Sequence, residues 1–382
     1  MAYALPYLAL LAAFALLAYW HRRAVVEDHR AYANWLSAAL FLFFFGFRGF
    51  VNYDWTAYYP EFYSLPSLYT LFTQAKWTFE PGFTLLAVAC KSIYAEWFFF
   101  QFVCSAINTL LIVRFWKRYS PNWPLAFAIY MCMNGVTIST DLMRNSISIL
   151  LFVNAIHYIG QKRFLPYLAH CLLGVLFHVS ALAYIPLYFV LGRKINKWVL
   201  IGVFIVANAV YLLHIPVVLS IVDLVIDILM PSTKLWVHEY LEMDAATTGS
   251  FLSIGYLERL LTACLVFAYI GKLRAMRPEG DVFINSVIIY ICLFLFLSEF
   301  RTISVRVSNL FVYAYWIIWI DLIGCFHYRN NRLLFSAFLA AYCVLKTISS
   351  NHTALSHYDN ILFGAKSYTE RLVLFRRHFN DK

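Results

Sequence analysis

The sequence WFFFQFVCSAINTLLIVRFWKR, residues 97–118, contains the pattern that decides the fold. Residues 97–113 carry no charged side chain, and a helix of that length nearly crosses a hydrocarbon layer of about 30 Å. Arg114, Lys117 and Arg118 follow directly. Short basic loops after apolar segments are typical of transmembrane helices that end on the cytoplasmic side, so we predict a membrane-spanning helix here.

The same pattern recurs along the whole chain. Of the 382 residues, 62% are apolar and 13% are charged, whereas soluble domains have about a quarter of their residues charged. We therefore predict an all-α polytopic membrane protein that forms a single membrane domain, residues 1–382, with about 12 transmembrane helices. The predicted spans are residues 3–20, 32–50, 97–113, 121–137, 145–160, 164–178, 180–192, 197–213, 254–271, 281–299, 303–321 and 332–348.

The basic residues set the predicted topology. Six short loops hold 16 of the 30 lysines and arginines. All six lie on the cytoplasmic side if the N-terminus is outside, residues 81–94 are re-entrant and residues 164–192 form two short helices. The alternative reverses the last two choices and moves two basic loops outside, against the positive-inside rule. The outer side then receives the loop 51–96 with its re-entrant segment, the amphipathic region 214–253 and the tail 349–382.

Neither the net charge of +10 nor the eight cysteines indicates another class of protein. Because the basic residues lie in short topology-setting loops, we expect no nucleic-acid partner. The cysteines lie in or beside apolar segments, without metal-ligand or CxxC spacing. The chain also has no DxD-like pair, histidine cluster, acid triad or glycine-rich phosphate loop. We therefore expect neither a metal nor a cofactor.

Several ionisable residues collect on the outer side of this topology. Inserting a charged residue into the centre of a span costs about 2.5–3.5 kcal/mol of free energy on insertion scales. Each such residue therefore needs a functional role or an oppositely charged partner to explain it. Arg306 lies several residues into an apolar run and is the hardest to explain structurally. The group comprises four arginines and three acid–base candidates: Arg48, Arg144, Arg301, Arg306, Asp54, Glu80 and His178.

Each of these residues also has a structural interpretation. Asp54 is placed to cap a surface helix, and Arg48 to extend toward lipid headgroups. Glu299 and Arg301 are close enough in sequence for a structural ion pair. A lone histidine such as His178 is more often a satisfied interior residue than a catalytic one. Together, however, four arginines and three acid–base candidates favour a polar cavity open to the outer side.

Arginine-rich membrane cavities suit a particular ligand. A guanidinium group keeps its charge and offers a fixed fork of donors to phosphate. We therefore expect a phosphate or pyrophosphate headgroup whose lipid tail stays in the bilayer. Arginine would neutralise the charge of the leaving group, and a neighbouring carboxylate or imidazole would take a proton from an attacking hydroxyl.

At these residues the sequence resembles the EpsG-like, Wzy-type polysaccharide polymerases of bacterial inner membranes. The resemblance extends from about residue 40 to residue 365, and its pieces gain specificity from occurring in series. One departure is Asn145, where glutamine is more usual after the arginine. The matching pieces are Arg48 with Asp54 and Tyr58, FEPGF at 79–83, LMRNSISI at 142–149, the stretch from Tyr158 and Ile159 through LFHVSALAYIPLYFV, SVRVSNLFVYAY at 304–315 and HYDNILF at 357–363.

The resemblance implies a membrane glycosyltransferase similar to those that use lipid-phosphate donors. Such an enzyme joins undecaprenyl-pyrophosphate-linked repeat units, those of an O-antigen or exopolysaccharide, at the periplasmic face of the inner membrane. It works without metal, and the configuration at the anomeric carbon inverts. The expected partners are the lipid-linked saccharides, membrane lipids and a regulator of chain length.

We assign roles to the candidate residues on this basis. Arg48, Arg144, Arg301 and Arg306 would bind the donor pyrophosphate. His178, Asp54 and Glu80 compete as general base, and His178 leads because an imidazole with a pKa near about 6.5 accepts protons at neutral pH. The sugar path would be lined by Tyr53, Trp55, Tyr58, Glu299 and Tyr358, although interfacial anchoring also explains the aromatic residues.

Other functions share parts of this chemistry. A flippase or transporter of lipid-linked saccharide would also use arginines, but it needs access from both leaflets. An O-acyltransferase needs only a histidine near the outer surface, and four arginines exceed what an acyl donor requires. A ligase that transfers finished polysaccharide differs only in its acceptor.

Overall fold

The computed structural model describes residues 2–74, 79–217 and 253–380 of the chain. The structure is 80% helical, and its described residues form no β-strand. The all-α fold class predicted from the sequence is therefore confirmed. Most of the region 214–253 lies outside the described residues, so its amphipathic structure stays a prediction.

The chain divides into two compact units, each of which is helical. The first holds the described residues of Met1–Tyr188 and His327–Lys382, and the second is Phe189–Phe326. The organisation of the whole chain as a single membrane domain stays a prediction.

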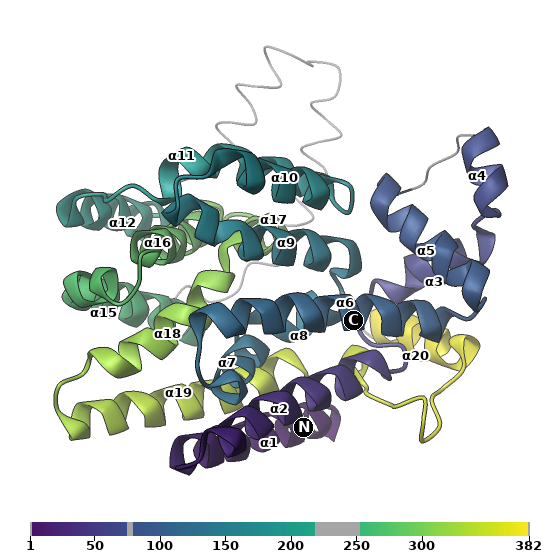
Figure 1. Cartoon of the computed structure of the whole chain (residues 1–382), viewed down its shortest axis with the longest axis horizontal. Coiled ribbons are helices and arrows are strands. Elements are labelled where there is room, and N and C mark those ends of the chain that lie inside the picture. The colour runs from purple at the N-terminus through teal and green to yellow at the C-terminus, as the bar shows by residue number, and fades with distance from the viewer. Residues whose placement is uncertain (1, 75–78, 218–252, 381–382) are drawn as a thin grey trace. The chain divides into compact units, whose positions relative to one another are not determined.

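The helices of the first unit are α1 (Leu5–Arg23), α2 (Glu27–Gly46), α3 (Trp55–Ser64), α4 (Leu68–Gln74), α5 (Pro81–Ile93), α6 (Trp97–Tyr119), α7 (Trp123–Tyr130), α8 (Val136–Thr140), α9 (Met143–Gly160), α10 (Phe164–Val175), α19 (Arg329–Ser350) and α20 (Tyr368–Asn380) (Figure 1). Shorter turns of helix are η1 (Ala2–Ala4), η2 (Met131–Gly135), η3 (Val179–Leu187) and η6 (Ala354–Ser356). The second unit holds α12 (Lys197–Leu212), α15 (Ile254–Ala275), α16 (Gly280–Phe296), α17 (Arg301–Ser308), η5 (Asn309–Phe311) and α18 (Tyr313–Cys325), and α11 (Tyr188–Leu191) lies at the division.

Four helices of the described chain are long and apolar enough to cross a membrane. They are Ala2–Arg23, Trp97–Tyr119, Ile254–Ala275 and Arg329–Ser350. A fifth span results if Ser304–Phe311 and Tyr313–Cys325, which meet at 56°, are counted together. These helices indicate a multi-pass membrane protein, while the larger predicted number of spans stays a prediction.

Residues 164–191 form two elements rather than one long helix, as the predicted topology requires. α10 ends at Val175, and η3 begins at Val179. The hydroxyl of Tyr167 in α10 donates a hydrogen bond to the carbonyl oxygen of Tyr184 in η3 at 2.5 Å. The two elements therefore pack on each other, and the turn between them contains His178.

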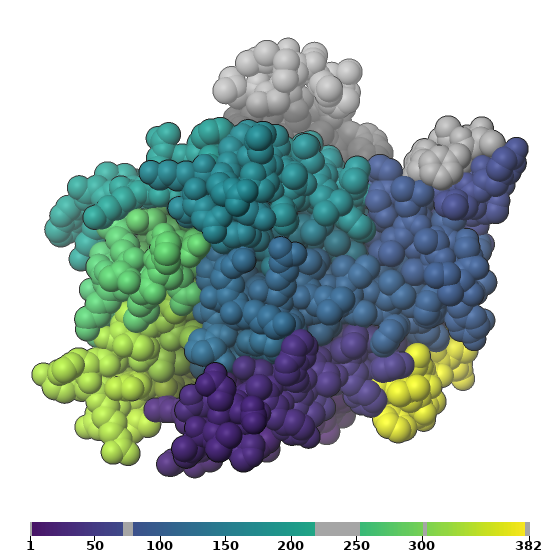
Figure 2. Space-filling model, viewed as in Figure 1, coloured from purple at the N-terminus to yellow at the C-terminus, as the bar shows by residue number. Residues whose placement is uncertain are grey.

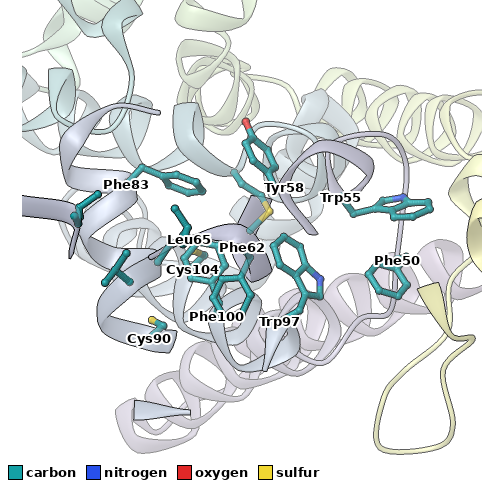
Figure 3. Packing of buried hydrophobic residues seen from close by; sticks show 14 residues of the cluster. Phe50, Trp55, Tyr58, Phe62, Leu65, Phe83, Cys90, Trp97, Phe100 and Cys104 are labelled. Carbon is teal, nitrogen blue, oxygen red and sulfur yellow. The ribbon is translucent and has the colours of Figure 1, made fainter. Parts of the chain in front are cut away.

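Aromatic packing fixes α3 against α5 and α6 (Figure 3). Phe62 of α3 stacks on Phe100 of α6 with ring centroids 5.4 Å apart, and Phe100 meets Phe83 of α5 at the same distance. Tyr58, one turn before Phe62, contacts Phe83 at 5.6 Å. Burying each such ring stabilises the fold by about 1.5–3 kcal/mol. The ring of Tyr58 is thus held in the core, and Figure 3 shows its hydroxyl pointing away from the cluster.

The C-terminal helix α20 packs on α3 and on the segment that precedes it. Arg371 is buried, and its Nε and Nη2 donate to the backbone oxygens of Phe50 and Leu355, each at 2.7 Å. The ring of Tyr368 stacks on Tyr59 of α3 at 4.3 Å. Figure 2 shows this yellow segment against the blue-to-purple surface of the early chain. The end of the chain therefore supports the start of α3.

The predicted topology places Arg118, at the end of α6, in the cytoplasm and Thr369, in α20, outside. Both residues are exposed. Of the eight cysteines, all of which lie in the described ranges, Cys264 is exposed and the others are buried. We expect a membrane-impermeant maleimide to label Thr369→Cys in intact spheroplasts of a Cys264→Ser strain, and to label Arg118→Cys only after permeabilisation. Labelling of Arg118→Cys from outside would overturn the topology.

Candidate functional site

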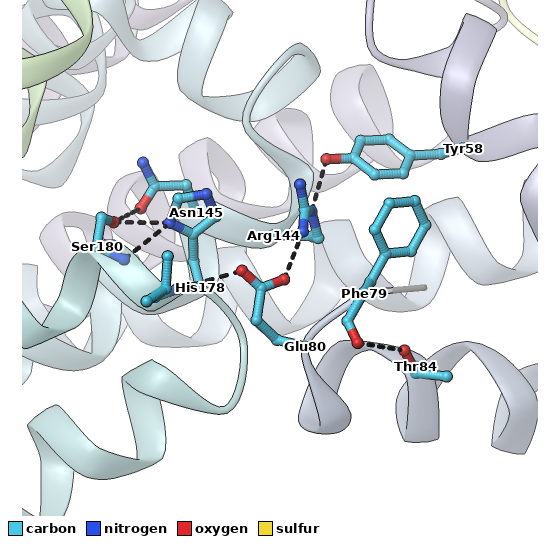
Figure 4. Close-up of polar contacts among 9 residues, drawn as sticks. Tyr58, Phe79, Glu80, Thr84, Arg144, Asn145, His178 and Ser180 are labelled. Atoms are coloured by element: carbon cyan, nitrogen blue, oxygen red, sulfur yellow. Dashed lines mark hydrogen bonds and ion pairs between the residues drawn. The ribbon is translucent and has the colours of Figure 1, made fainter. Parts of the chain in front are cut away.

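Three separated pieces of the sequence meet at one place in the first unit (Figure 4). Glu80 comes from FEPGF, Arg144 from LMRN and His178 from LFHVS. Glu80 Oε2 forms an ion pair with Arg144. Its Oε1 accepts a hydrogen bond at 3.2 Å from the backbone N–H of Val179, the residue after His178. Three of the seven predicted charged residues therefore lie together, and with Tyr58 we name them the Arg144 cluster.

Arg144, the second residue of α9, is oriented from several sides. Its Nε donates to the hydroxyl of Tyr58 at 2.8 Å, and its guanidinium carbon lies 4.6 Å from the ring centroid of Phe79. Nη1 is paired with Glu80, whereas Nη2 has no hydrogen-bond partner among the described residues. Since 23% of the side chain remains exposed, the guanidinium is positioned by the protein yet open to an anionic ligand.

Glu80 is a charged anchor rather than a free acid. Partial burial acts to raise the pKa of its carboxyl group, but the N–H groups of Glu80 and Val179 and the charge of Arg144 outweigh burial and hold that pKa below its ordinary value. A lowered pKa means that the carboxylate stays ionised at neutral pH and loses its charge only when the pH falls through the lowered value. The ion pair with Arg144 is therefore intact under physiological conditions.

His178 is the N-cap residue of η3, and Ser180, two residues later, fixes the position of its imidazole. Its Nδ1 accepts the backbone N–H of Ser180 at 3.2 Å and lies 2.8 Å from the Ser180 hydroxyl oxygen. That hydroxyl donates its hydrogen to Asn145 Oδ1 at 3.0 Å. Burial lowers the pKa of His178, and the charge of Arg144 acts in the same direction while Glu80 opposes it. The imidazole is therefore neutral at pH 7.

Asn145 is the position at which we expected glutamine from the sequence. The structure gives this residue a specific contact, because its amide oxygen accepts the Ser180 hydroxyl. The LMRN and LFHVS pieces are thus joined twice. Glu80 connects Arg144 to Val179, and Asn145 binds Ser180 directly. A short amide is sufficient for the second connection.

Residue 82 of FEPGF must be glycine because its backbone lies directly against Leu176. The N–H of Gly82 donates to the carbonyl oxygen of Leu176 at 2.7 Å. A Cβ atom at residue 82 would lie 2.8 Å from that oxygen and 2.9 Å from Leu176 Cβ, closer than packed atoms tolerate. Pro81 suits the first turn of α5, since its missing N–H needs no partner there. This close approach fixes Glu80 next to the end of α10.

Arg48 lies outside the Arg144 cluster, whereas Asp54 lies at the start of α3, where burial and the charge of Asp54 both act to raise the pKa of Tyr58. Arg48 is only 3% exposed, and its Nη1 donates to the carbonyl oxygen of Phe45 and, at 3.1 Å, to Ser105 Oγ. It joins the end of α2 to α6. Asp54 is the N-cap residue of α3, although its side chain makes no capping hydrogen bond. The roles predicted for these two residues stay predictions.

The aromatic residues predicted for a sugar path lie in three kinds of surroundings. Tyr53 is 46% exposed. Trp55 is buried and donates from Nε1 to the carbonyl oxygen of Asn52 at 2.9 Å, and Tyr358 stacks on Phe44 at 4.0 Å. Trp55 and Tyr358 thus have packing roles, Tyr53 faces outward, and Tyr58 orients Arg144.

The remaining candidates belong to the second unit. Glu299 lies in the turn before α17, Arg301 begins that helix, and Arg306 is exposed on it. The convergence of all four predicted arginines on one cavity stays a prediction. In the described part of the chain, no group of three His, Cys, Asp or Glu side chains is placed to hold a metal ion, and metal independence also stays a prediction.

The sequence analysis did not single out Asp141, which lies in the turn before α9. Its Oδ1 accepts the backbone N–H groups of Tyr53 at 2.8 Å and of Asp54 at 3.4 Å. These groups lead into α3, which carries Tyr58. The available signal was the acid that precedes the LMRN piece directly, in DLMRN.

Comparison with protein families decides the identity of the chain. The model of the EpsG family matches residues 33–362 of the 382. The chain belongs to the EpsG family. This confirms the resemblance predicted from the sequence, and it indicates that this EpsG protein is a polysaccharide polymerase of the membrane. Searches of curated proteins and of solved structures gave no match.

The matched range contains every residue of the Arg144 cluster in this EpsG protein. It also contains Arg48, Asp54 and the second-unit arginines. The helix α20 follows the matched range, which ends at residue 362.

Replacing Gly82 with alanine should destabilise this EpsG protein. The added methyl group would overlap the backbone of Leu176, and overpacking of this kind costs about 1–3 kcal/mol. We expect a lower midpoint of thermal unfolding for purified Gly82→Ala in detergent. Gly202→Ala in α12 is the matched control, because a Cβ atom at residue 202 would meet no other atom within 4 Å. Equal midpoints for the two variants would contradict the packing argument.

Proposed function

We propose that this EpsG protein polymerises undecaprenyl-pyrophosphate-linked oligosaccharide repeat units on the periplasmic face of the bacterial inner membrane. The single observation that supports the proposal is the Arg144 cluster, in which three pieces of a polymerase-family sequence form one ion-paired site. The cluster offers an oriented arginine to an anion, which is what a pyrophosphate leaving group needs. The outward orientation of the site rests on the distribution of basic loops.

The proposed reaction is an inverting glycosyl transfer. A hydroxyl oxygen on the incoming lipid-linked unit attacks the anomeric carbon of the growing chain and forms the new glycosidic bond. The bond from that carbon to the pyrophosphate oxygen breaks, and undecaprenyl pyrophosphate leaves with the electron pair. The hydroxyl proton passes to a base, for which His178, Asp54 and Glu80 are the candidates from sequence. No metal is required, since arginine carries the balancing charge.

Arg144 has the central role in this proposal. Tyr58 and Phe79 orient its guanidinium, and Glu80 holds Nη1. Nη2, which has no described partner, would bind a pyrophosphate oxygen. Because the guanidinium is already oriented, it loses no conformational entropy when negative charge develops on the leaving group. Its hydrogen bond therefore stabilises the transition state more than the bound substrate.

Arg48, Arg301 and Arg306 enter the proposal from the sequence alone. The same holds for about 12 transmembrane helices, the re-entrant segment 81–94 and the periplasmic regions 51–96, 214–253 and 349–382. The proposed partners are membrane lipids, the lipid-linked saccharides and a regulator of chain length. Together they describe a multi-pass inner-membrane enzyme whose site opens to the periplasm.

The proposal predicts that Arg144→Ala abolishes or strongly shortens the polymer. Loss of one oriented electrostatic donor lowers the rate by about 10²–10³. Polymer made in cells that carry each variant would be separated as a ladder on a gel. Arg118→Ala is the control, since that exposed arginine ends α6 outside the Arg144 cluster. Normal ladders from both Arg144→Ala and Arg306→Ala would overturn the assignment of the arginines.

An assay of whether the purified protein joins lipid-linked units distinguishes a polymerase from a transporter. A flippase would move the units without forming a glycosidic bond. Transfer of radiolabelled acyl groups to the product would instead indicate an O-acyltransferase, and transfer of finished polymer to a lipid core would indicate a ligase.

A further inference from the structure

The identity of the proton acceptor is open in the proposed reaction, and the hydrogen bonds of the first unit argue against two of the candidates, Glu80 and His178. Glu80 has both carboxylate oxygens engaged, Oε2 with Arg144 and Oε1 with the N–H of Val179. Proton transfer to Glu80 would require it to give up the ion pair that orients Arg144. An acceptor that must break the leaving-group site in order to act is unfavourable.

His178 is also unsuited to accept the proton. Its Nδ1 accepts the backbone N–H of Ser180, and the position of that hydrogen is fixed by the backbone. In a neutral imidazole one ring nitrogen accepts and the other carries the proton. The proton therefore lies on Nε2, which makes His178 a hydrogen-bond donor toward a ligand rather than a base.

Asp141 has the arrangement that a base requires. Oδ1 is fixed by the N–H groups of Tyr53 and Asp54, whereas Oδ2 has no hydrogen-bond partner in the described parts of the chain. The residue is partly exposed. One oxygen therefore sets the direction of the carboxylate and leaves the second free for a proton.

Asp141 is also linked to both sides of the Arg144 cluster. The turn that contains it leads directly into α9 and Arg144. The N–H groups that it holds lead into α3, whose Tyr58 hydroxyl binds Arg144 Nε. The carboxylate therefore lies at the junction of the two helices that orient the arginine, next to exposed Tyr53.

We propose that Asp141 is the general base of the polymerisation, and that it takes the proton from the attacking hydroxyl of the incoming unit through Oδ2. This inference rests on the proposed function. The attacking oxygen forms its bond to the anomeric carbon while its proton moves to the carboxylate, and the pyrophosphate leaves. Water then removes the proton from Asp141 before the next cycle.

The surroundings of Asp141 suit this role. Burial raises the pKa of its carboxyl group to about 6, although the N–H groups of Tyr53 and Asp54 and the charge of Arg48 act to lower it. The ionisable groups that interact electrostatically with it are Arg48 and Tyr7. A base whose pKa lies just below neutral pH is ionised in most molecules and still accepts a proton readily.

The Asp141→Asn substitution tests the role directly. An asparagine amide oxygen can still accept the two N–H groups, so the connection to α3 is kept while basicity is lost. We expect purified Asp141→Asn in nanodiscs to unfold at the wild-type temperature and to bind undecaprenyl pyrophosphate as the wild type does. We expect its rate of joining lipid-linked units, extracted from cells that lack this protein, to fall by about 10²–10⁴.

Glu370→Gln is the matched control. Glu370 Oε2 also accepts a backbone N–H, that of Ser367 at 2.9 Å, but Glu370 is exposed and lies outside the Arg144 cluster. Its rate should equal that of the wild type. Wild-type joining activity in Asp141→Asn would overturn the inference while leaving the proposed function intact. Absence of joining by the wild-type protein would instead overturn the proposed function.

The pH dependence of the wild-type rate gives a second test, which can be measured even if a variant fails to fold. Because the base must be ionised, the rate should rise with pH, pass through half of its maximum at a pH near the pKa of Asp141, about 6, and level off near neutral pH. Residual joining by Asp141→Asn should lack this rise. A wild-type rate that is constant between about pH 5 and 7.5 would overturn the inference.

Discussion

The ion pair between Glu80 and Arg144 is the interaction on which the rest of the site depends. Each charge would be costly in an apolar chain without the other, because partly buried ions need partners. Glu80 can reach Arg144 only because Gly82 lets α5 approach the end of α10. Arg144 can meet it only because Tyr58, held by the aromatic core, fixes its other side. One polar contact thus ties three distant segments together.

Much of the fold follows from apolar segments and basic loops. Some helix boundaries lie close to the predicted spans, as α9 (Met143–Gly160) shows against 145–160 and α12 against 197–213. The span predicted at 303–321 is instead broken, since Ser304–Phe311 and Tyr313–Cys325 meet at 56°. The turn at His178 was also predictable, since a single helix would have moved basic loops to the wrong side. The grouping of Glu80, Arg144 and His178 followed from the resemblance and from their common side. These features depend on composition and local order, which a sequence states directly.

Other features depend on contacts that a sequence does not state. Asp141 binds backbone N–H groups, and any residue type at 53 and 54 other than proline would supply them. No pattern of side chains therefore indicated these hydrogen bonds, although the acid in DLMRN was visible. The burial of Trp55 under Tyr368 likewise depends on a helix more than 300 residues away. His178 was predicted to be a base from its intrinsic pKa, whereas the Ser180 N–H determines which of its nitrogens holds the proton.

The docking of α20 has a consequence for the order of assembly. Arg371 binds the backbone oxygens of Phe50 and Leu355, and Tyr368 covers Tyr59. The segment that leads into α3 is therefore made early in translation but acquires its contacts with α20 only after that helix leaves the ribosome. Until then these backbone oxygens must be satisfied by water or by an assisting protein. The packing around the start of α3 is thus completed late, although this segment is made early.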